Sequence, residues 1–211
     1  MRILHIILSV FTEEMSYQEN LLPKYHAKDG HEVIILTSCY EIDTTGLTLF
    51  TPPVDKILSD GIRIVRMDYH KIINTFITRT IKKVDGIFQF IKLLLPDIIF
   101  FHGPQSIELL TVVKYIKDNP HVKLFIDNHA DLINSASNFI SLNILHKILW
   151  KYVAKKAEPY ASKFYGVLPA RVDFLINIYS ISKKKCELLG LGADDEKINK
   201  VKKNNVREQI I

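Results

Sequence analysis

Seven short apolar runs, separated by longer helix-like segments, constrain the fold of this 211-residue chain more than any other feature. Most of the runs are apolar at every position, which is typical of strands covered by helices on both faces of a sheet. They are residues 3–8, 33–37, 62–67, 98–101, 122–126, 164–168 and 186–189. Strands that alternate with helices predict βαβ units. The expected fold class is therefore α/β, with a doubly wound, mostly parallel sheet of about seven strands and helices on both faces.

The helix after the first strand has an identifiable start. Ser16 and Glu19 have the spacing of a capping box, and Gly30 suits a left-handed helix end. Pro23 would remove one hydrogen bond inside this helix. We therefore expect either a kink at Pro23 or a helix that begins near Leu22.

A second helix start follows the strand that ends at His102. Gly103 and Pro104 suit the cap and the first helical position, and residues 118–120 (Asp-Asn-Pro) predict the end. The expected buried face consists of Ile107, Leu110, Val113 and Ile116. The start of this helix would lie at the carboxyl edge of the sheet, where doubly wound folds bind ligands.

The remaining segments suggest how the chain is divided. Residues 39–60 contain Pro52 and Pro53 and predict an irregular connection, whereas residues 139–160 predict a long helix. After Gly192 the sequence becomes polar and lysine-rich. We therefore expect one domain over residues 1–192, followed by a linker and the incomplete start of a second domain over residues 193–211.

Charge and cysteine content narrow the function classes. The net charge of +5 and pI near 9.0 permit anionic partners, but no basic run interleaved with aromatics indicates nucleic acid. Cys39 and Cys186 have no metal-ligand spacing, so no metal or disulfide is expected, and a cytoplasmic location is the default. No apolar run reaches the roughly 20 residues of a membrane-spanning helix, so a soluble or peripheral protein is expected.

Five motifs in a fixed order resemble glycosyltransferase family four, which has the GT-B fold. They are SYQEN at 16–20, KDGHEV at 28–33, PDIIFFHG at 96–103, FIDNHAD at 125–131 and CELLGLGADDEKI at 186–198. The resemblance implies two Rossmann-like domains that face each other across a cleft, of which this chain would be the first. The first domain would bind the acceptor and the second the nucleotide-sugar donor. Transfer would retain the anomeric configuration without a metal ion, and no cofactor is expected besides the nucleotide-sugar, which would bind only with the second domain.

The resemblance implies a catalytic role for His129. In the family, a histidine at this place forms a hydrogen bond with a hydroxyl of the donor sugar. An imidazole can donate or accept such a bond, and neighbouring carboxylates would tune its pKa. From the residues alone, a structural histidine at a strand end is an equally good interpretation.

Further substrate contacts are expected at the same edge of the sheet. His102 and Gly103 would line the cleft, and Asp127 and Asn128 would lie beside His129. Asp127 and Asp131 also resemble an acid–base pair, but loop aspartates more commonly cap helices or form turns.

On the acceptor side, Ser16, Tyr17 and Gln18 are candidate polar contacts. Many family members have a Gly-Gly pair in the preceding loop, whereas this chain has Phe-Thr-Glu-Glu-Met at 11–15. Backbone contacts to phosphate from that loop are therefore not expected. A capping box alone would explain Ser16.

Two basic, apolar segments suggest contact with an anionic membrane. Lys147, Lys151, Lys155 and Lys156 lie on the predicted long helix, and residues 71–83 form the second segment. Basic amphipathic helices bury an apolar face in the membrane while lysines meet lipid headgroups. A core-packed helix with a solvated lysine face is the alternative.

Three functional hypotheses remain. The first is the acceptor-binding domain of a retaining glycosyltransferase for surface polysaccharide or lipopolysaccharide, inactive alone, with a saccharide or lipid-linked acceptor. The second is a non-catalytic module of a split glycosyltransferase that docks a membrane or a second-domain subunit. The third, an unrelated Rossmann-like nucleotide binder, is disfavoured because the first turn lacks a G-x-G-x-x-G phosphate loop.

Overall fold

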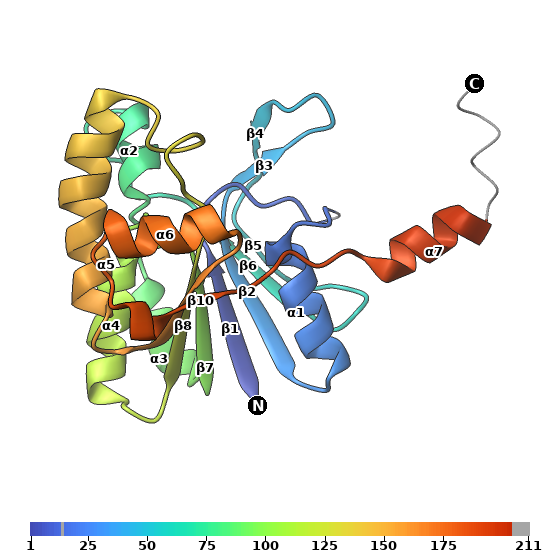
Figure 1. Ribbon diagram of the computed structural model, residues 1–211. Helices are drawn as coiled ribbons and strands as arrows, with labels where there is room; N and C mark the ends of the chain where they lie inside the picture. The colour runs from blue at the N-terminus through green and yellow to red at the C-terminus, as the bar shows by residue number, and fades with distance from the viewer. Residues whose placement is uncertain (14, 204–211) are drawn as a thin grey trace, which may run out of the picture.

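The computed structural model describes residues 1–13 and 15–203, and Figure 1 shows one eight-stranded sheet flanked by helices. The strand order is β10-β9-β8-β7-β1-β2-β6-β5. The strands are β1 (Arg2–Ile7), β2 (Glu32–Ser38), β5 (Val54–Ile57), β6 (Arg63–Met67), β7 (Ile98–His102), β8 (Lys123–Asn128), β9 (Ala161–Gly166) and β10 (Cys186–Leu188). The expected α/β fold with a mostly parallel sheet is confirmed. Residues 204–211, at the end of the predicted second segment, lie outside the described residues.

All seven predicted strands are present, and they pair in parallel. The expectation of an irregular connection over residues 39–60 is wrong. That segment forms the hairpin of β3 (Tyr40–Ile42) and β4 (Thr48–Phe50), followed by β5, which pairs antiparallel with β6 at the sheet edge. Edge strands need only one partner, so β5 does not require the apolar pattern that revealed the buried strands.

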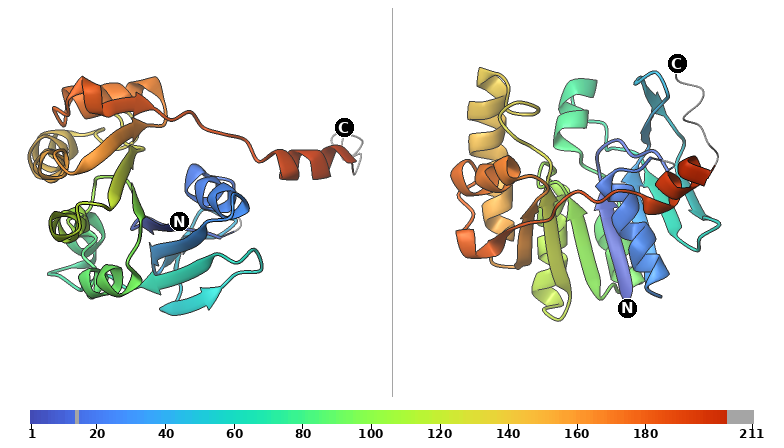
Figure 2. Two further views of the ribbon diagram at one scale, coloured as in Figure 1. Left: turned by 90° about the horizontal axis from the view of Figure 1, so that it is seen from below. Right: turned by 45° about the vertical axis from the view of Figure 1, so that its right-hand side comes forward.

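Helices lie on both faces of the sheet, as predicted. Helix α1 (Gln18–Lys28) covers one face, whereas α3 (Ile87–Leu94), α4 (Glu108–Asp118) and α5 (Lys151–Ala157) lie along the other (Figure 2). The other helical segments described are α2 (Thr75–Ile81), a π-helix (Ser141–Trp150), α6 (Pro169–Asn177), α7 (Asp195–Lys203) and a short 3₁₀ turn at Lys183–Lys185. The carboxyl ends of the parallel strands point upward in Figure 1, toward α2 and the β3–β4 hairpin.

Helix α1 begins differently from the prediction. Tyr17 occupies the N-cap position without a side-chain hydrogen bond, so Ser16 and Glu19 do not form the expected capping box. The helix runs through Pro23 from Gln18 onward, and Gly30 follows it at φ +80°, as expected. The Glu19 carboxylate is thereby left available for another contact.

Helix α4 starts four residues later than predicted, at Glu108. Gly103 has φ +86°, a conformation that glycine adopts without the steric cost of a Cβ. It therefore ends β7 in a turn instead of capping the helix. Val113 and Ile116 are buried as expected, and the helix ends at Asp118.

Two apolar clusters stabilise the sheet, one on each face. The larger cluster joins the strands to α3, α4, α5 and α6, and includes Leu4, Phe101, Trp150 and Phe174. The smaller one lies on the α1 side and consists of Ile7, Phe11, Val33, Ile35, Ile62 and Ile64. Burial of these side chains stabilises the sheet by about 25 cal/mol per Å² removed from water.

The predicted long helix is present, but it starts in an unusual form. Residues Ser141–Trp150 form a π-helix that continues directly into α5. Trp150 is buried against the core, whereas Ile144 and Ile148 are at least half exposed. Within the described residues, no helix is long and apolar enough to cross a membrane.

The chain leaves the sheet along α1. After β10, Asp194 contacts Lys24 of α1 at 3.1 Å, and Glu196 pairs with Lys24 and Lys28. Helix α7 then projects from the domain (Figures 1 and 2). A boundary near residue 192 stays a prediction.

Candidate functional site

A cavity of about 260 Å³ opens at the carboxyl edge of the sheet. Segments that follow three neighbouring strands, β1, β7 and β8, meet the start of α1 and the end of α2 around it. The lining residues are Ser9, Glu19, Lys82, His102, Gly103, Gln105, His129, Ala130, Asn134 and Ser135. Ligands of doubly wound sheets bind at this kind of edge. We therefore take the carboxyl-edge cavity as the candidate site.

His129 lies between two carboxylates in the cavity. Its Nε2 atom is 3.3 Å from Asp127 Oδ2 and 3.6 Å from Glu19 Oε1, and 30% of its side chain is exposed. The backbone at this point is held by Asn134, whose Nδ2 donates to the carbonyl of His129 at 2.7 Å. The predicted histidine thus combines a fixed position with access from the cavity.

The carboxylates shift the pKa of His129. Burial alone lowers this pKa, but the hydrogen bond and charge of Asp127 and the charge of Glu19 outweigh burial, so the net pKa is raised above 6.5. Arg171 opposes the increase. A larger fraction of His129 is therefore protonated near neutral pH than for a free histidine, which favours its role as a hydrogen-bond donor.

A chain of histidines continues beneath the cavity into the sheet. His102 Nδ1 is 2.7 Å from Asp127 Oδ2, His5 Nδ1 is 3.0 Å from His102 Nε2, and His26 Nδ1 is 3.0 Å from His5 Nε2. An ionised Asp127 can only accept, so His102 donates through Nδ1. Donation that runs from His26 to His5 and from His5 to His102 is compatible with these contacts.

Burial and charge agree with this direction of donation. Burial, followed by the charges of His102 and His26, lowers the pKa of His5 well below 6.5, so His5 is neutral. Asp127 is completely buried, which would raise its pKa, but the charges and hydrogen bonds of His102 and His129 lower it below its ordinary range. The buried carboxylate is thus held in its charged form.

The same atoms have the arrangement of possible metal ligands. His102, Asp127 and His129 each offer one ligand atom, and these atoms lie within 4.8 Å of one another. Hydrogen bonding already satisfies His102 Nδ1 and Asp127 Oδ2 without a metal. The expectation of a metal-free site stays a prediction.

The predicted residues at the strand ends gather at or under the cavity. His102 and Gly103 line it, although the His102 imidazole is almost fully buried. Asp127 accepts from the Gly103 N–H at 3.0 Å, and Asn128 donates to the Ala130 and Arg171 carbonyls. Both Asp127 and Asn128 are completely buried, so they support the cavity from below rather than form its surface.

The predicted acceptor-side residues are divided by the start of α1. Tyr17 is 63% exposed and Ser16 is also exposed, whereas Gln18 is only 6% exposed and its amide has no hydrogen-bond partner among the described residues. None of the three lines the carboxyl-edge cavity. Their role as ligand contacts stays a prediction.

Glu19, Lys82 and Gln105 are site residues that sequence reasoning did not assign. The sequence pattern places Glu19 in a capping box and Lys82 in a basic surface segment. Gln105 donates to Asn128 Oδ1 at 3.0 Å and to the hydroxyl of Tyr179 at 2.8 Å, and so links the cavity to the core.

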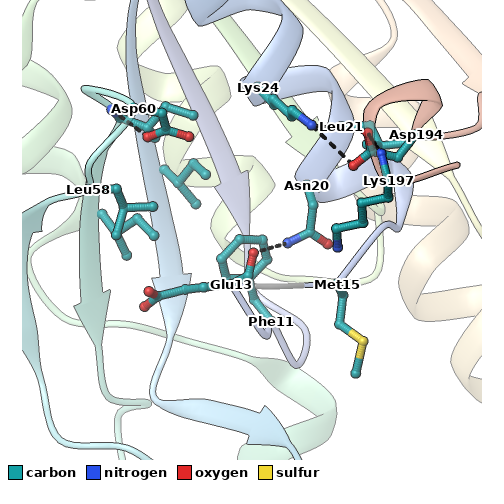
Figure 3. Close-up of a pocket in the computed structure, with 13 residues that line it drawn as sticks. Phe11, Glu13, Met15, Asn20, Leu21, Lys24, Leu58, Asp60, Asp194 and Lys197 are labelled. Carbon is teal, nitrogen blue, oxygen red and sulfur yellow. Dashed lines mark hydrogen bonds and ion pairs between the residues drawn. The ribbon is translucent and has the colours of Figure 1, made fainter. Parts of the chain in front are cut away.

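A second cavity, of about 280 Å³, lies beside α1 on the other side of the loop that follows β1 (Figure 3). Phe11 and Leu21 contribute to its apolar walls, and Asn20 donates to the Glu13 carbonyl at 3.2 Å. The loop that was expected to face the acceptor therefore divides the two cavities. Phe11 points into the core and is not available to a ligand of the carboxyl-edge cavity.

The four predicted membrane-contact lysines lie on the long helix and not at the cavity. Lys147, Lys155 and Lys156 are exposed and Lys151 is half-buried. Exposed apolar side chains accompany them: Phe139, Ile140, Ile144, Ile148 and Tyr152.

Fold and site together define a Rossmann-like α/β domain with a histidine–carboxylate site at the carboxyl edge of its sheet. Its fold is similar to part of sucrose-phosphate synthase from Thermosynechococcus elongatus, with TM-score 0.62 and 12% identity over 93% of this chain and 49% of that chain. A second chain of that enzyme superposes with TM-score 0.58 and 13% identity over 99% of both chains. The chain thus spans about half the length of the first of these structures. No family model and no curated protein matches the sequence.

Proposed function

We propose that the chain is the acceptor-binding domain of a retaining glycosyltransferase. It would serve the transfer of a sugar from a nucleotide-sugar donor to a saccharide or lipid-linked acceptor in surface polysaccharide or lipopolysaccharide synthesis. The observation that carries the proposal is the position of His129 between Asp127 and Glu19 in the carboxyl-edge cavity. The fold likeness to sucrose-phosphate synthase adds support for a sugar-transfer function.

The chemistry of the site suits a sugar ligand. Sugar hydroxyls both donate and accept hydrogen bonds, and the cavity offers the His129 imidazole, with its raised pKa, as donor and the Glu19 carboxylate as acceptor. Asp127 engages His129 through Nε2, which leaves Nδ1 for the ligand. The imidazole would thereby orient the sugar and stabilise charge that develops on its oxygens in the transition state.

The donor diphosphate requires further groups. We expect a second domain, on the same polypeptide or on a partner subunit, to hold most of the nucleotide and to supply charge to the departing diphosphate. The described residues would then bind the acceptor and contact the transferred sugar, and would not turn over donor by themselves. The proposed location is the cytoplasm, at the inner face of the plasma membrane.

Ligand binding at His129 tests this proposal. The full chain, labelled with ¹⁵N at histidine, is titrated with UDP-, GDP- and ADP-sugars and with saccharide acceptors, while the imidazole signals are followed by NMR. We expect at least one sugar ligand to shift the His129 signals, and His129→Ala to abolish binding. His121→Ala is the matched control, because His121 is exposed and does not line the cavity. Absence of any shift across the panel, or unchanged binding by His129→Ala, contradicts the proposal.

A second candidate function is a non-catalytic module that docks an anionic membrane or a partner subunit. The exposed apolar side chains along the long helix favour it, because a helix that only packed on the core would bury them. Lys147, Lys151, Lys155 and Lys156 would contact lipid phosphates on the same helix. This function is compatible with a lipid-linked acceptor.

Sedimentation with vesicles tests membrane docking. We expect the chain to bind phosphatidylglycerol vesicles more tightly than phosphatidylcholine vesicles, with weaker binding at high salt. Replacing Ile144 and Ile148 together by Asp should abolish binding, whereas Lys92→Ala on α3 serves as a charge control outside this helix. Equal binding to both kinds of vesicle, or unaltered binding by the double variant, would rule out this mode.

A further inference from the structure

Lys82 has a backbone conformation that lysine adopts only at a cost. It caps the carboxyl end of α2 with φ 51° and ψ 42°, in the left-handed region. Helices that end in this conformation usually have glycine or asparagine there, because a Cβ costs roughly 1–2 kcal/mol. Leu95 ends α3 in the same conformation, so the conformation alone assigns no function to Lys82, and its contacts must be considered.

The surrounding contacts hold Lys82 in this conformation. Its N–H donates to the Thr78 carbonyl at 3.0 Å, and its own carbonyl accepts from Ser106 Oγ at 3.1 Å. Ser106 is buried, and the nearby Val84 N–H donates to Glu108 Oε1 at 3.1 Å. The turn after α2 is therefore fixed against the start of α4.

The side chain of Lys82 belongs to the carboxyl-edge cavity, together with Glu19, His102, Gly103 and His129. Among the described residues it forms no ion pair, whereas Lys24, Lys28, Lys56, Lys155 and Lys163 each pair with a carboxylate. Burial lowers the pKa of Lys82 to about 8, so its amine still carries a proton at neutral pH. Lys82 is half-buried, and an ammonium group partly withdrawn from water without a paired carboxylate favours an anionic ligand.

We propose that Lys82 is an anion-binding residue, and that the ligand of the carboxyl-edge cavity bears a phosphate or diphosphate beside the group that meets His129. This inference rests on the proposed function and narrows its substrate class. The position of Lys82 in the cavity, without an ion pair among the described residues, supports it independently of the pKa, and the anchored turn holds the residue there. Residues with strained backbones that are held by surrounding contacts are often found at ligand sites.

The anion has two chemical sources. It is either the diphosphate of the nucleotide-sugar donor or the phosphate of a lipid-linked acceptor. Either source would place phosphate oxygens against the Lys82 ammonium group. Inorganic pyrophosphate therefore probes the shared chemistry. UDP and a short-chain prenyl diphosphate distinguish the sources, because each adds one of the two possible organic groups.

Calorimetric titration of the full chain with these probes tests the proposal. We expect pyrophosphate to bind, and Lys82→Gly to weaken it by about tenfold or more, as for loss of a charge-assisted hydrogen bond. Lys82→Asn provides a second variant that also suits the left-handed conformation. The adjacent, exposed Lys83 supplies the control. Lys83→Gln removes one positive charge, as Lys82→Gly does, but should alter pyrophosphate binding less than twofold.

Folding of the variants is checked independently by thermal unfolding. Lys82→Gly relieves the strain, so its Tm should not fall by more than a few degrees.

Equal pyrophosphate binding by the native chain and Lys82→Gly overturns the inference, as does failure of all three probes to bind the native chain. If the probes bind through Lys82 but no sugar ligand shifts His129, the anion site stands and the proposed glycosyltransferase function fails. If sugar ligands shift the His129 signals equally in Lys82→Gly and the native chain, and no probe depends on Lys82, the glycosyltransferase proposal stands and the anion site fails.

Discussion

His102 and His129 share a single oxygen atom of Asp127. Oδ2 of this carboxylate lies 2.7 Å from His102 Nδ1 and 3.3 Å from His129 Nε2. The buried Asp127 carboxylate therefore contacts both His102 inside the sheet and His129 in the cavity. His5 and His26 extend this contact to the α1 face of the domain.

Removal of the shared charge should lower the pKa of His129. In Asp127→Asn, only Glu19 remains to counter burial, so we expect the pKa of His129 to fall below its value in the native chain. Titration of the imidazole signals by NMR measures it. Asp85→Asn removes a carboxylate that pairs with His70 instead, and should leave His129 unchanged. A His129 pKa that is the same in Asp127→Asn and the native chain would contradict the assigned contact.

The raised pKa of His129 also makes the free energy of unfolding depend on pH. The pKa of His129 is raised on folding, so its contribution to stability is fully present below pH 6.5 and is lost as the pH rises through the folded-state value. The stability difference between native and Asp127→Asn chains should therefore narrow above that value. Urea unfolding at a series of pH values measures this difference.

The sequence predicted the central sheet because buried parallel strands are apolar at nearly every position. It missed β5 and the β3–β4 hairpin, where pairing at the sheet edge, and not local composition, determines the structure. His129 was predictable because it directly follows a strand. Glu19 was not, because the same Ser-x-x-Glu spacing equally suits a helix cap. Lys82 depends on a left-handed turn that only tertiary contacts impose.

His146 should make the protein sensitive to mild acid. It is buried between the hydroxyls of Tyr179 and Ser135, at 2.7 and 3.1 Å, and burial lowers its pKa to about 4. A depressed pKa leaves stability intact above pH 6.5 and removes it as the pH falls toward 4. This group should cost about 3 kcal/mol over that range, converted from the shift at 1.36 kcal/mol per unit.

Urea unfolding at pH 7.5 and pH 4.5 separates His146 from the other titrating groups. His146→Gln cannot gain a proton, so its free energy of unfolding should fall less between the two pH values than that of the native chain. His70→Gln is the control, because His70 is exposed and bonds to Asp85 at 2.6 Å. Identical pH dependence in His146→Gln and native protein would show that His146 does not titrate in this way.

Arg66 should hold together the loop that divides the two cavities. Its side chain is fully buried and pairs with Glu13 at 3.3 Å and Glu41 at 2.5 Å. It also donates to the Phe11 and Ser38 carbonyls. We expect Arg66→Met to lower the free energy of unfolding by about 2–4 kcal/mol, because the two carbonyls lose a buried donor and Glu41 loses its partner, whereas Glu13 keeps Lys56.

Arg63 is the matched control on the same strand. It pairs with Asp55 at the surface, where both side chains are at least 40% exposed, so Arg63→Met should cost less than about 1 kcal/mol. Hydrogen exchange should accelerate in the segment around Phe11 only in the Arg66 variant. Equal stability losses in the two variants would argue against a special role for the buried arginine.

A side chain at Gly166 should disturb the packing of α6 against β9. It ends β9, and a Cβ there would lie 2.3 Å from the backbone nitrogen of Val172 and 2.7 Å from the carbonyl carbon of Arg171. These are backbone atoms of α6, so they cannot rotate away, and the helix itself must shift. Movement of α6 would also stretch the bond that Asn128 Nδ2 donates to the Arg171 carbonyl beneath the cavity.

Gly166→Ala is therefore expected to lower the free energy of unfolding by about 2–3 kcal/mol. Gly190→Ala, where the added Cβ meets no atom within 4 Å, should change it by about 0.5 kcal/mol or less. Chemical denaturation of both variants measures the difference. Because the shift of α6 reaches Asn128, Gly166→Ala should also move the His129 imidazole signals, whereas Gly190→Ala should not. Loss of stability without any change at His129 would mean that the cavity is insulated from the packing of α6.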